Sequence, residues 1–167
     1  NVYIVAVKRT AIGSFGGSLR SLSAVDLAVP VIKKILDMLQ IENENIDEVI
    51  IGNVFKAGLK GNPARQVAIK SGLHYSIPAM TIDKQCGSGL KAIILGANEI
   101  ALGQADLVLT GGIESMTNVP HIHLNSRWGN RLDDLQIVDG LLYDGLHCAI
   151  EGYHMGITAE NLAKKYD

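Results

Sequence analysis

Residues 81–102 constrain the fold more than any other part of the chain, because they join a strand-like apolar run directly to a helical pattern. The apolar run ends shortly before Cys86, and apolar residues at helical spacing begin at Leu90. Cys86 is therefore expected at a strand-to-helix turn, where free backbone N–H groups and the positive end of the helix dipole favour a thiolate over a thiol. Gly87 and Gly89 are small enough to leave room for a substrate beside the sulfur. The stretch predicts a cysteine nucleophile on a rigid mount.

Strand-like and helical patterns alternate through the first part of the chain. Strands are predicted at residues 2–7, 46–55, 79–82 and 105–110. A helix follows each of the first three strands, and Ser23 and Asn62 are the expected N-caps of the first two helices. This β-α-β-α-β-α-β order predicts a layered α/β domain with right-handed crossovers. The helix after Cys86 is apolar on nearly all sides and is expected to be buried between layers.

The chain changes character after Asn118, which gives two predicted regions: an α/β domain over residues 1–118 and an irregular region over residues 119–167. The second region contains repeated Asp-Gly pairs and shows no clear apolar period until Thr158, the expected N-cap of a last helix. That helix stops in mid-pattern without a C-cap signal. We therefore expect the chain to be a fragment of a larger protein.

Composition and charge argue against several classes of function. The formal net charge of -2 gives no basic surface for nucleic acid or an anionic membrane, and no apolar stretch is long enough to span a membrane. The two cysteines, Cys86 and Cys148, have no C-x-x-C spacing, and His121, His123 and His147 lack paired ligand spacing. We therefore expect no disulfide, no metal site, no nucleic-acid or membrane partner, and a cytoplasmic protein.

Four motifs, in this order along the chain, resemble the signatures of the thiolase family. They are Arg9-Thr10 with Gly13, Phe15, Gly17 and Leu19; Cys86-Gly87-Ser88-Gly89-Leu90; Gly111-Gly112-Ile113-Glu114-Ser115-Met116; and Gly152-Tyr153-His154-Met155-Gly156. The glycine after Cys86 resembles the acetoacetyl-CoA type of thiolase more than the long-chain degradative type. Two positions depart from the family pattern: Ala11 stands where Pro is usual and Asp83 where Asn is usual. An ionised Asp83 near the sulfur would oppose thiolate formation.

The resemblance implies the first half of a duplicated, thiolase-like α/β fold, followed by part of a loop domain that binds coenzyme A and mediates oligomerisation. It implies that two acetyl-CoA molecules condense to acetoacetyl-CoA and CoA, or the reverse thiolysis, through an acyl-enzyme on Cys86. Leu146, His154 and Met155 fall where the family lines the CoA and acyl pocket. The substrate is then an acyl-CoA and no separate cofactor is expected. The activating His and a second, acid/base Cys belong to a C-terminal half that this chain does not contain, so we expect a homo-oligomeric enzyme of which this fragment alone is inactive.

Three other interpretations of the sequence stay open. Residues 87–92 fit the dinucleotide fingerprint G-x-G-x-x-[GA], although that motif normally follows the first strand of its domain and the next strand here lacks a terminal acidic residue. A β-ketoacyl synthase shares the resembled fold and its cysteine nucleophile, but the second pair of motifs favours a thiolase. The chain can also be a non-catalytic interaction module that binds another protein through the apolar helix after Cys86. Cys86 itself could be a small buried residue, since free cysteine is often buried.

Overall fold

The computed structural model describes residues 1–42, 44–129, 131–132 and 134–166. The chain divides into two compact units, residues 1–118 and residues 119–167.

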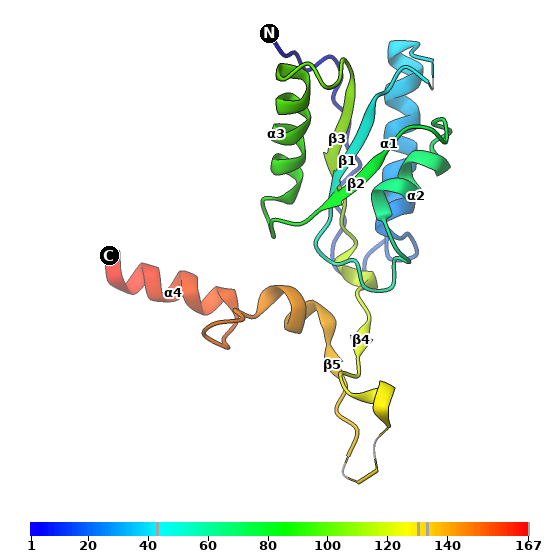
Figure 1. Ribbon diagram of the computed structural model, residues 1–167. Helices are drawn as coiled ribbons and strands as arrows, with labels where there is room; N and C mark the ends of the chain where they lie inside the picture. The colour runs from blue at the N-terminus through cyan, green and yellow to red at the C-terminus, as the bar shows by residue number, and fades with distance from the viewer. Residues whose placement is uncertain (43, 130, 133, 167) are drawn as a thin grey trace. The chain divides into compact units, whose positions relative to one another are not determined.

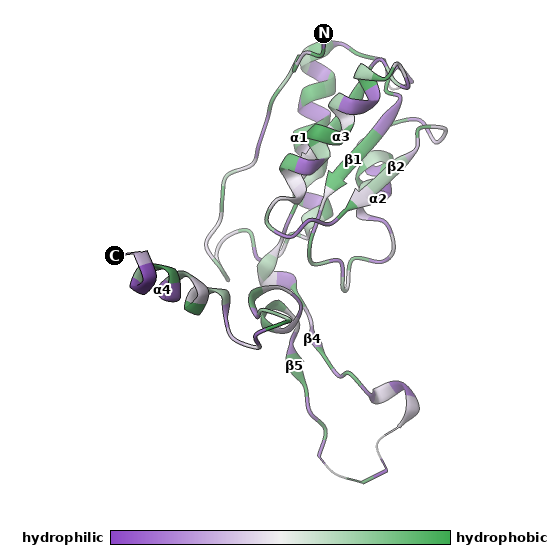
Figure 2. Cartoon of the chain, turned by 60° about the vertical axis from the view of Figure 1, so that its left-hand side comes forward, coloured by the Kyte–Doolittle hydropathy of each residue, from purple (hydrophilic) through white to green (hydrophobic). Residues whose placement is uncertain are grey.

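The first unit is built on a parallel sheet of three strands in the order β2-β1-β3. The strands are β1 (Glu48–Gly52), β2 (Ala79–Ile82) and β3 (Val108–Gly112). Three consecutive residues of the central strand, Val49, Ile50 and Ile51, are at most 2% exposed, and Figure 2 shows β1 as hydrophobic over most of its length. A parallel strand covered on both faces requires such a continuous apolar run.

Helices cover both faces of this sheet (Figure 1). On one face lie α1 (Ala24–Leu39) and α2 (Pro63–Lys70), and on the other lies α3 (Ser88–Ala101). The two predicted N-caps are present, since the Ser23 hydroxyl accepts a hydrogen bond from the backbone of Asp26 and the Asn62 side chain accepts one from Arg65. The result is an α/β/α layered unit.

The main core lies between the sheet and the pair formed by α1 and α2. It is made of Val25, Ala28, Ile32, Leu36, Ile46, Val49, Ile51, Ala64, Val67, Ala68, Leu73 and Ile77. Ile50 is fully buried but stands outside this cluster, because alternate strand residues point to opposite faces and Ile50 faces the α3 side.

The strand predicted at residues 2–7 is not formed, so the observed order lacks the first β element. No described residue pairs with this segment in a strand ladder, and Tyr3, Ile4 and Val7 are each 73% exposed. A cavity of about 280 Å³ is lined by residues 1–6, by residues 106–110 of the β3 region, and by residues of α1 and α3. The segment has a high β propensity, but a strand forms only where a neighbouring strand accepts its hydrogen bonds.

The expectation that α3 is buried between layers is also wrong for this chain. Its buried residues are Ser88, Ala92 and Gly96, which form the stripe facing the sheet. Leu90, 65% exposed, and Ile94, 44% exposed, lie outside that stripe. The helix therefore covers the sheet with one face and leaves an apolar face in solvent.

The second unit contains little regular structure. Its elements are β4 (His121–Ile122), which pairs antiparallel with β5 (Val138–Asp139), a short 3-10 helix (Ser126–Trp128), a π-helix (Leu142–Leu146) and α4 (Met155–Tyr166). The last helix begins before Thr158, which is therefore inside the helix rather than its N-cap. Within the described part of the chain, no helix has the length and apolar character needed to cross a membrane.

Candidate active site

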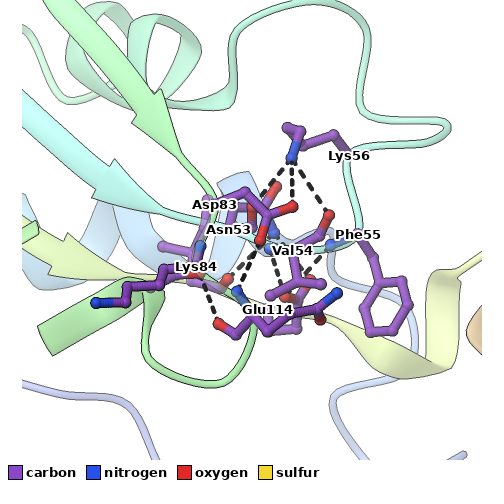
Figure 3. Close-up of polar contacts among 10 residues, drawn as sticks. Asn53, Val54, Phe55, Lys56, Asp83, Lys84 and Glu114 are labelled. Atoms are coloured by element: carbon purple, nitrogen blue, oxygen red, sulfur yellow. Dashed lines mark hydrogen bonds and ion pairs between the residues drawn. The ribbon is translucent and has the colours of Figure 1, made fainter. Parts of the chain in front are cut away.

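The loops that follow the three strands of the sheet meet at one edge, because parallel strands all end on the same side. Residues 53–56 follow β1, residues 83–87 follow β2, and residues 113–115 follow β3. Figure 3 shows side chains and backbone from all three loops in polar contact. Ligands of open α/β sheets bind outside the carboxyl ends of the strands, so this edge is the candidate active site.

Cys86 lies in the turn between β2 and α3 and is exposed. Two backbone hydrogen bonds hold the turn: Gly87 N–H donates to the Lys84 carbonyl at 3.1 Å, and Ser88 N–H donates to the Gln85 carbonyl at 2.9 Å. The buried Ser88 hydroxyl adds two more, since it donates to the Gln85 carbonyl at 2.6 Å and accepts from Lys84 N–H at 2.8 Å. A negative charge on Cys86 would lie next to the positive end of α3.

Glycines bring the start of α3 into direct backbone contact with the sheet. A Cβ atom on Gly52, at the end of β1, would collide with the backbone of Ser88. A Cβ atom on Gly112, at the end of β3, would lie 3.0 Å from the Gly89 Cα atom. A Cβ atom on Gly89 would lie 3.4 Å from the Gly112 Cα atom, so the start of α3 also contacts the end of β3. This close packing fixes the start of α3, and with it the turn that carries Cys86, against the ends of β1 and β3.

Glu114, just after β3, anchors the loop that follows β1. Its Oε1 atom accepts a hydrogen bond from Asn53 Nδ2 at 2.8 Å, and its Oε2 atom accepts one from Val54 N–H at 3.0 Å. Asn53 is 1% exposed and also donates to the Ile113 carbonyl at 3.2 Å. Burial raises the pKa of Glu114, and the hydrogen bonds from Val54, Phe55 and Asn53 oppose that rise. Glu114 belonged to a motif noted in the sequence, but its role as an anchor was not foreseen.

Lys56 and Asp83 form an ion pair that joins the loop after β1 to the turn of Cys86 (Figure 3). The Lys56 Nζ atom lies 3.1 Å from Asp83 Oδ2, and the two side chains are 41% and 40% exposed. Asp83 Oδ1 accepts a hydrogen bond from Gln85 N–H at 2.9 Å. The carboxylate that departs from the family pattern is therefore paired with a cation. No local pattern points to Lys56, because it lies 27 positions away along the chain.

The three residues expected to bind substrate all lie in the second unit. Leu146 ends the π-helix and is partly buried, whereas His154 and Met155 are exposed at the start of α4. An antiparallel backbone bridge joins His147, the residue after Leu146, to His154. The centroids of the two imidazole rings are 6.0 Å apart, and the ring planes make an angle of 83°. His154 Nδ1 accepts a hydrogen bond from Gly156 N–H at 3.0 Å, so this side chain caps α4. The structure thus brings these three residues together within their own unit.

Cys148 differs from Cys86 in its surroundings. It is partly buried, its N–H donates to the Tyr153 carbonyl at 2.8 Å, and its sulfur accepts a hydrogen bond from Glu151 N–H at 3.4 Å. These contacts place it inside a tight turn of the second unit. Across the residues that the structure describes, no group of three or more His, Cys, Asp or Glu side chains could hold a metal ion.

Known proteins resemble the chain over its whole length. A family model described as the thiolase N-terminal domain matches residues 2–167. The chain is 52% identical to an acetyl-CoA acetyltransferase of Escherichia coli (strain K12), over 99% of this chain and 42% of that protein. It is 51% identical to an acetyl-CoA acetyltransferase of Cupriavidus necator with the same coverage. A solved thiolase from Ascaris suum in complex with coenzyme A matches with a TM-score of 0.89 and 42% identity, over 95% of this chain and 41% of that one.

These matches bear on two of the interpretations that the sequence left open. The family model favours a thiolase over a dinucleotide-binding domain or a β-ketoacyl synthase. The chain spans 42% of the length of the two curated relatives named above. The resemblance noted in the sequence is confirmed: the chain belongs to the thiolase family, of which it forms the N-terminal domain.

Proposed function

We propose that this chain supplies the nucleophile of an acetyl-CoA C-acetyltransferase, which condenses two acetyl-CoA molecules to acetoacetyl-CoA and CoA or catalyses the reverse thiolysis. The observation that carries the proposal is Cys86, which is exposed on a hydrogen-bonded turn at the carboxyl edge of the sheet and belongs to a motif that resembles the family's nucleophile motif. The names of the relatives support the substrate class. Because the chain spans only part of their length, the activity of the whole enzyme is part of this proposal.

The chemistry begins with attack of the Cys86 thiolate on the carbonyl carbon of one acetyl-CoA. A carbon–sulfur bond to the enzyme forms, the bond to CoA breaks, and CoA leaves as a thiolate that takes up a proton. A base then removes an α-proton from the second acetyl-CoA, whose carbon attacks the acyl-enzyme, forms the new carbon–carbon bond and frees Cys86. The backbone N–H of Cys86 is the proposed donor to the oxyanion. The covalent intermediate divides one difficult condensation into two easier steps.

Leu146, His154 and Met155 are the proposed contacts to the CoA thioester, which is a substrate, so no separate cofactor is needed. The Ascaris suum thiolase is in complex with coenzyme A, which supports this ligand class. In this proposal residues 119–167 form part of a loop domain. The activating His and the second Cys come from a C-terminal half, and the whole enzyme is a cytoplasmic homo-oligomer.

Cleavage of acetoacetyl-CoA in the presence of CoA tests the proposed function. The protein at its natural length is expected to cleave this substrate, and Cys86→Ala is expected to abolish the reaction. Cys148→Ala is the matched control and should leave most of the activity, since the Cys148 sulfur is already hydrogen-bonded within its turn. The 167-residue chain alone is expected to be inactive. Rapid cleavage by that chain would contradict the need for a C-terminal half.

A second candidate function, a non-catalytic interaction module, is favoured by the apolar face of α3. Leu90, Ile93 and Ile94 are 65%, 40% and 44% exposed. An apolar face of this kind favours association with another protein surface. The reactivity of Cys86 distinguishes the two functions. An interaction module still binds its partner protein when Cys86 is replaced, and it forms no covalent adduct with acetyl-CoA.

A further inference from the structure

The ion pair between Lys56 and Asp83 belongs to a longer run of contacts at the carboxyl edge of the sheet. The Lys56 ammonium also donates to the carbonyl oxygens of Asn53 and Val54, both at 3.4 Å. These two residues are in turn fixed by the carboxylate of Glu114, which accepts hydrogen bonds from the Asn53 side chain and from Val54 N–H. The ammonium is therefore held against a loop that is itself anchored to β3 (Figure 3).

Asp83 connects this run of contacts to the residue that precedes Cys86. Gln85 has φ 49°, a left-handed conformation that residues other than glycine rarely adopt. The Asp83 carboxylate supports this conformation by accepting the Gln85 N–H at 2.9 Å, as Asp side chains do in tight turns. The direction in which Cys86 leaves the turn therefore depends on the position of the Asp83 carboxylate.

We propose that Lys56 and Asp83 are a positioning pair for Cys86. Lys56 holds the Asp83 carboxylate where it fixes the turn, and it balances a negative charge that would otherwise disfavour the Cys86 thiolate. The inference rests on the proposed function, in which Cys86 is the nucleophile. Neither member of the pair is a contact to substrate, and both act through Cys86.

The charges around the turn explain why the pairing matters. A carboxylate close to a thiol disfavours the thiolate unless a cation balances its charge. The other charged side chains within five positions of Cys86 are Lys84 and Lys91, and the ion pair found for Asp83 in the described structure is the one with Lys56. Because both partners are about two-fifths exposed, solvent screens their charges and the expected effect is a few-fold change in reactivity.

The test is the rate at which iodoacetamide alkylates Cys86 as a function of pH, measured by peptide mass spectrometry on the protein at its natural length. Cys148 in the same digest is the internal reference. In Lys56→Met the rate at neutral pH is expected to fall about threefold, with the pH midpoint of alkylation moving up by about half a unit. Lys56→Arg should keep the wild-type profile. The double variant Lys56→Met with Asp83→Asn should recover it, because Asn keeps the acceptor for Gln85 N–H without the charge.

Lys70→Met is the matched control, since it removes a second exposed ion pair, Lys70–Asp26, with a 2.9 Å separation on the helices that cover the other face of the sheet. It should leave the Cys86 profile unchanged. An unchanged profile in Lys56→Met, or a double variant as slow as Lys56→Met, overturns the positioning role. The alkylation assay does not depend on turnover, so it is separate from the proposed function: retained thiolysis in Cys86→Ala overturns that function whatever the alkylation profiles show.

Discussion

Glu114 accepts a hydrogen bond from the buried Asn53 side chain at 2.8 Å, across the ends of the neighbouring strands β1 and β3. Its second oxygen accepts the Val54 N–H, so both carboxylate oxygens act as acceptors. Glu114→Gln replaces one of these acceptors with an NH2 donor, which leaves a donor facing a donor. We predict a loss of about 1–3 kcal/mol in the free energy of unfolding, measured by urea denaturation at neutral pH.

The matched control for Glu114→Gln is Glu42→Gln, which removes the same charge from an exposed residue. It is expected to change the free energy of unfolding by less than about 0.5 kcal/mol. Equal stabilities for the two variants would show that Glu114 does not anchor the loop after β1.

Glu48 and Glu99 bring two carboxyl groups together between the start of β1 and the end of α3. Burial and the neighbouring Glu99 raise the pKa of Glu48 from 4.5 to about 7. The folded protein therefore retains a proton that the unfolded chain releases, and the free energy of unfolding falls as pH rises from 4.5 to about 7. Glu48→Gln should remove this dependence and stabilise the protein above neutral pH by about 1 kcal/mol after solvent screening. Urea denaturation across this pH range measures it, and an unchanged slope would contradict the assignment.

Gly52, at the end of β1, packs directly against the backbone at the start of α3. Gly52→Ala places a methyl group against the Ser88 backbone, which must shift, so we predict a loss of about 1–3 kcal/mol in stability together with slower alkylation of Cys86. Gly111→Ala is the control on the neighbouring strand, since a Cβ atom there meets nothing within 4 Å. Thermal denaturation compares the two variants. Equal stability would mean that this contact does not position the turn.

The exposed apolar face of α3 predicts that the isolated 167-residue chain associates with itself. Leu90 and Ile94 stand one helical turn apart and are 65% and 44% exposed. Replacing both with Lys should shift the isolated chain toward monomer in sedimentation velocity. Tyr75→Lys, at a residue 74% exposed outside this helix, should leave association unchanged. A monomeric wild-type chain would argue against an unpartnered surface on α3.

Local rules predicted those elements whose signals lie in neighbouring residues. Ser23 and Asn62 cap the helices that follow them, and the strand predicted at residues 79–82 is β2, because caps and apolar runs are encoded within a few positions. The turn at Cys86 was predicted on the same basis.

Features that depend on distant partners could not be predicted in this way. Residues 2–7 have the composition of a strand, but pairing depends on a neighbouring strand edge and not on propensity. Lys56 is 27 positions from Asp83, and no pattern in the residues around either one predicts that the two form an ion pair. His154 caps α4, whereas the sequence predicts Thr158 as the N-cap. Thr is among the residues preferred at N-caps and His is not, so the local pattern favours the wrong residue.

Detection of an acetyl group on Cys86 shows whether this cysteine is the nucleophile. The protein at its natural length is incubated with acetyl-CoA, quenched in acid and digested, and the peptides that carry Cys86 and Cys148 are compared by mass spectrometry. We predict acetylation of Cys86, removal of the acetyl group on addition of CoA, and no acetylation of Cys148. Turnover of acetoacetyl-CoA with an unmodified Cys86, or with the acetyl group on Cys148, would contradict it.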